Sequence, residues 1–308
     1  MCVSLLRRTV VLLIVVLIPL VAAAQNNRSA VAITGSDAAT CTVPDPCRTF
    51  GVALSKTNAG GEVIVLSSGG YGPFTVSQSV TIVSPSGIYA AIAPTSGTGI
   101  VISTASGASV VLRGLYVNGA LGGSVGVWVL SAGTITYLEN MVIAGFSLGG
   151  AVGVYETAAA DFRIKDSFVR NNYYGIAFSG ASASSRARAT IDHCRVEGNT
   201  YAISPATFTD TTVSESLMTG NFRGLSIDSG GTDIDARVAV NDSVFAQNSV
   251  GIFAIRTLAL VRVAGSTITQ NTQFALDIQQ GAQVTSAGNN VVIDNAAKET
   301  FSGTFALQ

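Results

Sequence analysis

The sequence predicts an all-β fold, a parallel β-helix solenoid of about nine coils with a short N-terminal capping helix. Three observations support this prediction. Only 11% of the 308 residues are charged, against about 25% in an average soluble protein. The 33 glycines, among many Ser, Thr and Val residues, suit short strands and tight turns. From residue 109 onward one pattern recurs every 22 to 27 residues, which suits one solenoid coil.

The chain begins with a segment typical of an export signal. Arg7 and Arg8 precede an apolar run from Val10 to Val21, and Ala22–Ala24 provide small residues for cleavage. A membrane-spanning helix needs about 20 apolar residues, so this run is short for an uncleaved anchor, which is the alternative. We expect residues 1–24 to be a signal peptide. The mature protein is then periplasmic or extracellular and has no membrane span.

The cysteines predict one covalent link. Cys41 and Cys47 flank a turn-rich stretch that contains two prolines, and a disulfide between them is expected in an oxidising compartment. Cys2 belongs to the expected signal peptide. Cys194 falls within the repeat, where it occupies a column of small, mostly serine residues, and is therefore expected to be a buried small residue.

A short helix is expected ahead of the first coil. Phe50, Ala53 and Leu54 recur at helical spacing and predict an amphipathic helix over Thr49–Lys56. This helix is expected to cover the end of the first coil, where strand edges would otherwise be unpaired. The predicted divisions are an N-terminal segment and cap at 25–60, the β-helix at 61–295 and a C-terminal tail or cap at 296–308.

The repeat consists of alternating apolar residues, a small residue, a further apolar residue, an asparagine and then Gly-Ile. Alternation predicts that each apolar column is an inward-facing row of stacked strands. The first predicted row is Leu112, Tyr137, Ile164, Ile191, Val213, Val240, Val263. The second is Val117, Val142, Val169, Val196, Met218, Phe245, Ile268, and the third is Ile176, Ile203, Leu225, Ile252, Leu276. The small-residue column is Leu115, Asn140, Ser167, Cys194, Ser216, Ser243, Ser266, Asn289.

One asparagine per coil falls at the same turn. These residues are Asn172, Asn199, Asn221, Asn248 and Asn271. Stacked amides at one turn predict a ladder of hydrogen bonds from coil to coil that satisfies backbone groups, so their role is expected to be structural. A glycine follows three residues later in most coils and is expected to allow the turn geometry, as at Gly175, Gly224 and Gly251.

The segment CTVPDPCRTF (41–50), the GGEVIVL segment (60–66) and the repeating D-S-x-x-x-x-N-x-x-G-I coils carry a resemblance. They resemble the right-handed parallel β-helix proteins of the pectate-lyase-like superfamily, over residues 31 to 295. The resemblance implies a right-handed helix. It implies no single activity, because this fold hosts lyases, hydrolases, epimerases, phage tailspikes and adhesins.

The resemblance also sets expectations for catalytic residues. Polygalacturonase-like hydrolases combine Asn-Thr-Asp, Asp-Asp, Gly-His-Gly and Arg-Ile-Lys motifs, and of these the chain has only the last, at residues 163–165. Pectate-lyase-like enzymes hold Ca²⁺ with acidic residues and use Arg or Lys as the base. The candidates here are Arg163, Lys165 and Asp192, with Lys165 and Asp192 expected to be neighbours across the sheet. The alternative is an exposed ion pair.

A column of acidic residues is a candidate for binding Ca²⁺. The column just before the small residue reads Gly114, Glu139, Asp166, His193, Glu215, Asp242, Gly265. Its metal candidates are Glu139, Asp166, Glu215 and Asp242. The simpler interpretation is a turn with positive φ, where Gly, Asp and His are enriched, and His193 is then a turn residue. A single histidine also excludes a site of several histidines within one chain.

Aromatic and basic side chains give weak candidates for ligand binding. Tyr173, Tyr174 and Tyr201 occupy turn positions on consecutive coils, where they either stack on sugar rings or pack against one another. Arg186 and Arg188 lie near the charged lyase candidates.

The functional hypotheses follow from two observations. The sequence predicts a complete β-helix, and it lacks the catalytic motifs of the enzymes that share this fold. The leading one is binding of a polysaccharide or another extracellular or cell-envelope polymer without catalysis. A lyase acting on a polyuronate is the alternative, and a structural surface spacer is the third. No cofactor is expected, with Ca²⁺ only in the lyase alternative. The net charge of −1 gives no basis for nucleic-acid binding.

Overall fold

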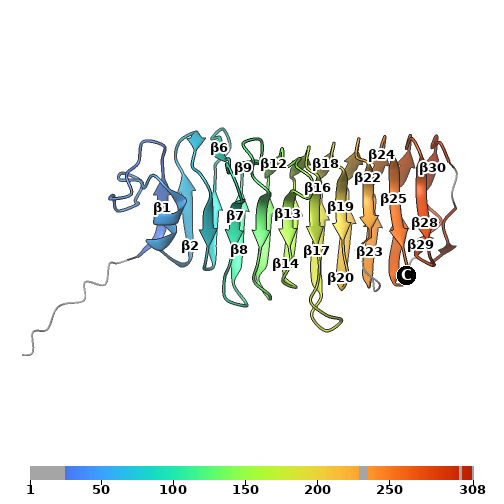
Figure 1. The fold of residues 1–308 in the computed structure, drawn as a ribbon. Coiled ribbons are helices and arrows are strands. Elements are labelled where there is room, and N and C mark those ends of the chain that lie inside the picture. Colours follow the sequence, from blue (N-terminus) through green and yellow to red (C-terminus); the bar gives the residue numbers. More distant parts are fainter. Residues whose placement is uncertain (1–24, 229–234, 298–299, 307–308) are drawn as a thin grey trace, which may run out of the picture.

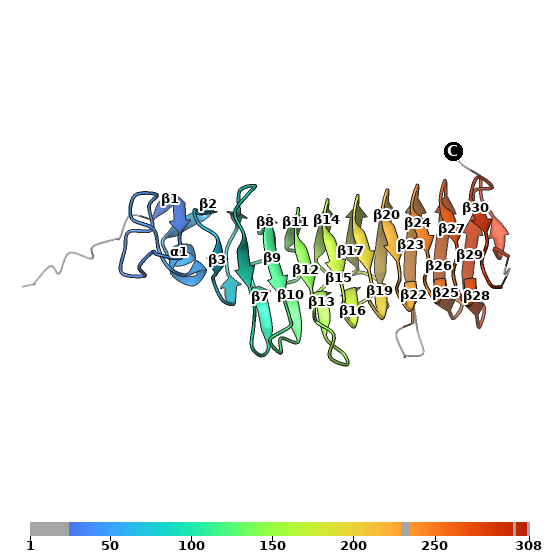
Figure 2. The ribbon, with the colours of Figure 1, turned by 90° about the horizontal axis from the view of Figure 1, so that it is seen from above.

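The computed structural model describes residues 25–228, 235–297 and 300–306. It confirms a right-handed parallel β-solenoid, in which successive coils stack along one axis (Figures 1 and 2). Each regular coil contributes one strand to each of three parallel sheets. The predicted signal peptide lies outside the described residues. No helix among the described residues is long and apolar enough to cross a membrane.

We call the three sheets sheet 1, sheet 2 and sheet 3, in the order in which a coil passes through them. Sheet 1 has twelve strands: β1 (Asn26–Val31), β2 (Thr57–Val65), β5 (Val80–Val83), β8 (Ser109–Arg113), β11 (Ile135–Glu139), β14 (Asp161–Lys165), β17 (Ala187–Asp192), β20 (Thr209–Ser214), β23 (Ala236–Asn241), β26 (Ala259–Ala264), β29 (Gln283–Ser286) and β31 (Gly303–Thr304).

Sheet 2 has ten strands: β3 (Gly69–Gly70), β6 (Ala90–Ile92), β9 (Leu115–Asn118), β12 (Val142–Ala144), β15 (Phe168–Arg170), β18 (Arg195–Glu197), β21 (Leu217–Thr219), β24 (Val244–Ala246), β27 (Thr267–Thr269) and β30 (Val291–Ile293). Sheet 3 has nine: β4 (Phe74–Val76), β7 (Thr98–Ile102), β10 (Val125–Val129), β13 (Val152–Glu156), β16 (Tyr174–Phe178), β19 (Tyr201–Pro205), β22 (Arg223–Ile227), β25 (Val250–Ile255) and β28 (Phe274–Gln279).

The connections between the sheets differ in length. From β8 to β27 the passage from sheet 1 to sheet 2 is a turn of one or two residues. The passage from sheet 2 to sheet 3 is three or four residues long from β15 onward, but it is longer at residues 119–124 and 145–151. The connection from sheet 3 back to sheet 1 varies, from residues 206–208 in one coil to residues 179–186 in the coil before it. From β14 onward the differences in coil length therefore fall in this third connection, whereas the two preceding coils carry their extra residues between sheets 2 and 3.

The N-terminal end has the predicted helix and disulfide. Helix α1 (Phe50–Ser55) begins after Thr49, whose side-chain oxygen accepts a hydrogen bond from the backbone N–H of Val52. The ring of Phe50 lies 4.5 Å from that of Phe74 on β4, centroid to centroid, so the helix packs onto the first coil. Cys41 and Cys47 are joined by a disulfide.

The inner rows are confirmed, with one correction in the coil that contains β11 and β12. Leu138, not Tyr137, aligns with Ile164 and is fully buried. Likewise Ile143, not Val142, aligns with Val169 in the second row. The sequence alignment matched the small polar Asn140 to the serine column, whereas the larger Met141 fills that position, and this shifted the whole coil by one residue.

The small-residue column forms a ladder of its own. The Oγ atoms of Ser216, Ser243 and Ser266 each accept a hydrogen bond from the backbone N–H at the same position one coil earlier. Asn290, not Asn289, continues this ladder, because its Oδ1 accepts from the N–H of Ser266. Cys194 is buried in the column as predicted, and burial raises the pKa of its thiol to about 12.

The asparagine ladder is confirmed and is longer than predicted. The side-chain amide nitrogen of each asparagine donates to the side-chain oxygen of the next, at distances of 2.8 to 3.1 Å. The same oxygen also accepts the backbone N–H of the preceding asparagine, as Asn221 does for Asn199 at 2.9 Å. Asn295, which the sequence analysis missed, is the last member and receives both bonds from Asn271.

The glycines after the asparagines serve a different purpose from the one predicted. Gly175, Gly224 and Gly251 lie within strands β16, β22 and β25, and none has a positive φ. A Cβ atom at Gly175 would lie 2.5 Å from the carbonyl oxygen of Ala202 on the next coil. Glycine is therefore favoured here by the close approach of the neighbouring backbone and not by turn geometry, and the small residues Ala202 and Ala275 replace it in the same column.

One carboxyl group is buried in the core. Glu156 ends β13 between Val129 and Phe178 of the neighbouring strands and is fully buried. Its Oε1 accepts hydrogen bonds from the backbone N–H groups of Ala158 and Ala160, while its Oε2 has no partner among the described residues. Burial raises the pKa of Glu156 from 4.5 to about 7, although the hydrogen bonds oppose this change.

We predict that Asn221→Ala destabilises the solenoid. The change removes the oxygen that accepts the backbone N–H and the side-chain amide of Asn199, so the buried N–H loses its partner while the amide keeps its bonds to Val169 and Glu197. It also removes the bonds that the Asn221 amide donates to Val196 and Asn248. The expected loss in the free energy of unfolding is about 2–4 kcal/mol, measured by urea denaturation. Thr219→Ala on β21, two residues away and half-buried, is the control, and an equal loss in that variant would contradict the ladder's role.

The buried Glu156 predicts a pH dependence of stability. Because its pKa is higher in the folded state than the ordinary 4.5, its contribution is most favourable below pH 4.5 and is lost as the pH rises to about 7. Relative to Glu156→Gln, the free energy of unfolding of the wild type should fall by up to about 3 kcal/mol over this range. Urea denaturation at several pH values measures the difference, and parallel curves would refute the prediction.

Candidate functional site

The outer face of sheet 1 carries three rows of side chains that run along the solenoid axis. The loop-side row, next to the third connection, alternates in charge: Asp161, Arg188, Asp210, Arg237. The turn-side row, next to the turn into sheet 2, also alternates: Arg113, Glu139, Lys165, Asp192. Between them lies the middle row: Tyr137, Arg163, Thr190, Thr212, Ala239, Arg262.

The turn-side row consists of neighbouring ion pairs. Lys165 Nζ lies 3.4 Å from Asp192 Oδ2, so these two lyase candidates are neighbours across the sheet as expected. Arg113 lies 2.6 Å from Glu139 in the same row. Exposed pairs of this kind contribute at most about 1 kcal/mol each. Arg163, the third lyase candidate, belongs to the middle row, where its guanidinium lies over the ring of Tyr137.

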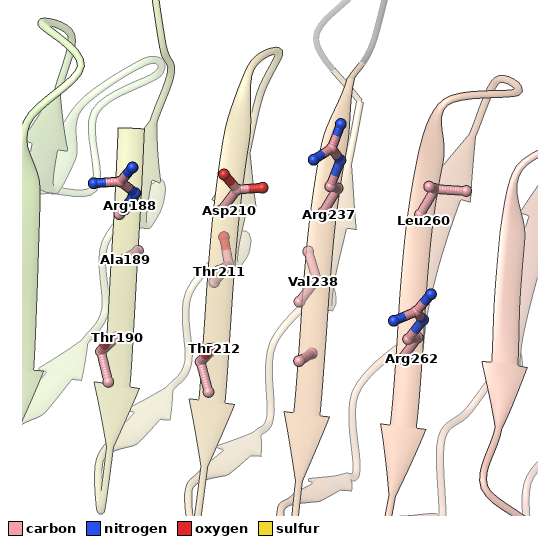
Figure 3. A pocket seen from close by; sticks show the side chains of 11 residues that line it. Arg188, Ala189, Thr190, Asp210, Thr211, Thr212, Arg237, Val238, Leu260 and Arg262 are labelled. Atoms are coloured by element: carbon pink, nitrogen blue, oxygen red, sulfur yellow. The ribbon is translucent and has the colours of Figure 1, made fainter. Parts of the chain in front are cut away.

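A groove crosses strands β17, β20, β23 and β26 on this face. Its volume is about 700 Å³, and Figure 3 shows that side chains from four neighbouring strands line it. The lining residues are Arg188, Ala189, Thr190, Asp210, Thr211, Thr212, Arg237, Val238, Ala239, Leu260 and Arg262. Three arginines thus face the groove against one carboxylate, and small residues of the middle row form the floor between them.

The groove arginines are exposed, and their ion pairs are long. Arg188 lies 3.7 Å from Asp161, and Arg237 lies 3.6 Å from Asp235. The side chains of both arginines are more than half exposed. Arg262 lies beside the ring of Phe305 at the far end of the groove. These guanidinium groups therefore keep donors available to an anion.

Arg186 differs from its neighbour Arg188. Its side chain is only 10% exposed, and it donates to Asp210 and Asp235 at 2.8 Å each and to the backbone oxygen of Thr209 at 2.7 Å. Arg186 therefore links the starts of three successive coils. Asp210, the one carboxylate of the groove, is consequently already neutralised.

The tyrosine candidates lie on another face. Tyr174 and Tyr201 are paired neighbours on β16 and β19 of sheet 3, and their rings stack 4.9 Å apart. Tyr173 meets both rings edge-on. These rings cover one another, and the three tyrosines are partly buried. The structure therefore brings them together, but away from the groove.

The proposed Ca²⁺ column needs one correction. Asn140, not Glu139, occupies it, because the coil is shifted by one residue, and Glu139 pairs with Arg113 instead. The column does consist of turn residues with positive φ, including Asp166 (50°), His193 (50°), Glu215 (45°) and Asp242 (48°). The interpretation of this column as a turn is therefore confirmed.

The structure also contains a cluster around His193 that was not predicted from the sequence. Its Nδ1 lies 3.0 Å from Oδ1 of Asp192, and its Nε2 lies 2.9 Å from Oε2 of Glu215 on the next coil. Consecutive strand residues normally point to opposite faces, but the positive φ of His193 turns its ring toward Asp192. The signal was present in the sequence, since His193 and Glu215 are adjacent in the aligned column.

Comparisons with known proteins agree with this architecture. The model of the family described as "right handed beta helix region" matches residues 98–297. Among solved structures, pectate lyase Pel9A aligns with 92% of this chain and 79% of its own, at 16% identity and a TM-score of 0.66. No curated protein sequence matches the chain.

Two further lyases have a similar fold. An alginate lyase from Paenibacillus sp. aligns with 91% of this chain and 98% of its own, at 13% identity and a TM-score of 0.60. A rhamnogalacturonan lyase aligns with 90% of both chains, at 12% identity and a TM-score of 0.57. Identities this low show a shared fold only. The family match spans well over half of the sequence, and the chain therefore belongs to the right-handed β-helix family.

Proposed function

We propose that the protein binds an anionic polysaccharide along the groove of sheet 1. The observation that carries this proposal is the excess of arginine: Arg188, Arg237 and Arg262 face the groove against Asp210, which Arg186 already neutralises. Arginine presents several N–H donors in a planar fork that matches a carboxylate. A polymer with one acidic group per sugar supplies such anions at regular intervals.

The shape of the groove supports a linear ligand. It crosses four strands, and because neighbouring strands lie about 4.8 Å apart, it extends for about 14 Å along the solenoid axis. The floor offers the hydroxyl groups of Thr190 and Thr212, which hydrogen-bond to sugar hydroxyls. The similar solved structures include lyases of pectate and alginate, and this favours a sugar polymer over other anions.

Binding without catalysis remains the leading proposal. A Ca²⁺-dependent lyase needs several acidic ligands, and the groove lining contains only Asp210. Lys165 and Asp192 neutralise each other in the turn-side row. The lyase alternative is supported by Arg163, an exposed cation of the middle row whose neighbour Thr190 lines the groove.

We also propose that the protein works outside the cytoplasm. The disulfide between Cys41 and Cys47 is the structural support, because such bonds persist in oxidising compartments. A structural spacer of the cell surface remains the third hypothesis, and it predicts no affinity for polysaccharide.

We predict that purified protein binds polygalacturonate or alginate but not neutral dextran. Arg237→Gln and Arg262→Gln should each weaken binding about tenfold, the effect of losing about 1.4 kcal/mol of interaction. Isothermal titration calorimetry provides the measurement. Arg195→Gln, which removes an exposed arginine on sheet 2, is the matched control.

Equal affinity in the groove variants and the wild type, or an equal loss in Arg195→Gln, would overturn the proposal. The same mixtures test the lyase alternative, because β-elimination creates unsaturated sugars that absorb ultraviolet light. A rise in absorbance that Arg163→Gln abolishes would establish catalysis. A flat trace with retained binding supports binding alone.

A further inference from the structure

The cluster of Asp192, His193 and Glu215 lies outside the groove, at the turn from sheet 1 to sheet 2. It contains the only histidine of the chain. Among the described residues it is the one group of three metal-binding side chains whose ligand atoms all lie within 4.8 Å of one another. We propose that His193 and Glu215 bind a zinc-type divalent cation, with Asp192 orienting the histidine.

The distance between the two ligand atoms fits a metal ion. His193 Nε2 and Glu215 Oε2 are 2.9 Å apart. Zinc lies about 2.0–2.2 Å from such atoms, and two ligands at angles of 90–109° around it are then about 2.9–3.4 Å apart, so the observed separation corresponds to an angle near 90°. The same separation is that of a hydrogen bond between the imidazole and the carboxylate. A bound cation would take the place of the proton between the two atoms.

Asp192 supplies the orienting contact that metal-binding histidines usually have. Its Oδ1 accepts a hydrogen bond from His193 Nδ1 at 3.0 Å, which leaves Nε2 as the atom that coordinates. Asp192 is itself held by Ser214 Oγ at 2.8 Å and by Lys165. Partial burial opposes ionisation of Asp192, but the hydrogen bonds from Ser214 and His193 lower its pKa below the ordinary value. The carboxylate is therefore ionised and fixed.

The surroundings leave room for the remaining ligands of the metal. His193, Glu215 and Asp242 line an open hollow of about 530 Å³, so water molecules complete the coordination shell. Asp242 is in the same column, but its carboxylate lies over Gly265 on the next coil. A Cβ atom added at Gly265 would be 2.1 Å from its Oδ1. The basic Arg195 at the hollow pairs with Glu197.

The chemistry of the ligands selects the class of cation. An imidazole nitrogen with a carboxylate oxygen suits zinc and other first-row divalent cations. Ca²⁺ takes six to eight oxygen ligands, which this pair does not offer. The hydrogen bond to Asp192 raises the pKa of His193, so protons compete with the metal and binding should strengthen as the pH rises.

The test is a calorimetric titration of the purified protein with Zn²⁺, after removal of any affinity tag. We expect one site with a dissociation constant in the micromolar range and no competition from an excess of Ca²⁺. His193→Asn and Glu215→Gln should weaken binding at least tenfold. Asparagine tolerates the positive φ of this position and occurs at the same turn at Asn140, so the first variant keeps the fold.

Two further variants separate this site from general attraction by acidic side chains. Asp242→Asn removes a charge from the same column and should bind Zn²⁺ like the wild type. Asp192→Asn should weaken binding about tenfold, as expected for a residue that orients a ligand. Because the chain has one histidine, its imidazole nitrogen signals in NMR should report coordination through Nε2.

No binding at millimolar Zn²⁺ would overturn the proposal, as would an unchanged affinity in His193→Asn or an equal loss in Asp242→Asn. These outcomes are independent of polysaccharide binding, because they concern side chains that do not line the groove.

Discussion

Hydrogen bonding between successive coils is the constraint on which this structure depends. A single coil has no partner for the outward edges of its three strands, and it finds those partners only in the coils before and after it. At the turn into sheet 3 the same dependence extends to side chains, where each asparagine completes the backbone and amide hydrogen bonds of the previous one. At the turn into sheet 2 the serine hydroxyls accept the backbone N–H groups of the previous coil. The stability of each coil thus depends on its contacts with the two adjacent coils, as in other solenoids.

This dependence explains why so much of the fold could be predicted from the sequence. Residues that must match across coils recur in the sequence, so the inner rows, the asparagine ladder and the burial of Cys194 could be inferred from periodicity. The error at Tyr137 arose where the repeat loses its most informative residue, since Met141 replaces serine there. Met141 takes part in the ladder only through its backbone N–H, which donates to Ser167. Its side chain therefore gives no sign in the sequence that this position belongs to the ladder.

The outer face was harder to predict, because side chains that face solvent need not match from coil to coil. Alternation identified Lys165 and Asp192 as neighbours. The groove, however, depends on which exposed side chains are small and which arginines remain uncommitted. Arg186 and Arg188 are two residues apart in the sequence, yet one is enclosed by two aspartates and the other is exposed. The His193 cluster could not be predicted without the backbone conformation of His193, because its positive φ directs the ring toward Asp192 and Glu215.

The variable third connection has an evolutionary consequence. It borders the loop-side row of the groove, whereas both ladders lie at the other two turns. From β14 onward, differences in length therefore fall at one corner of the coil and leave the register of the stacked strands unchanged. In this part of the solenoid the residues that maintain the architecture are separate from the connection whose length varies, so that a different rim for the groove can arise by a change in loop length alone.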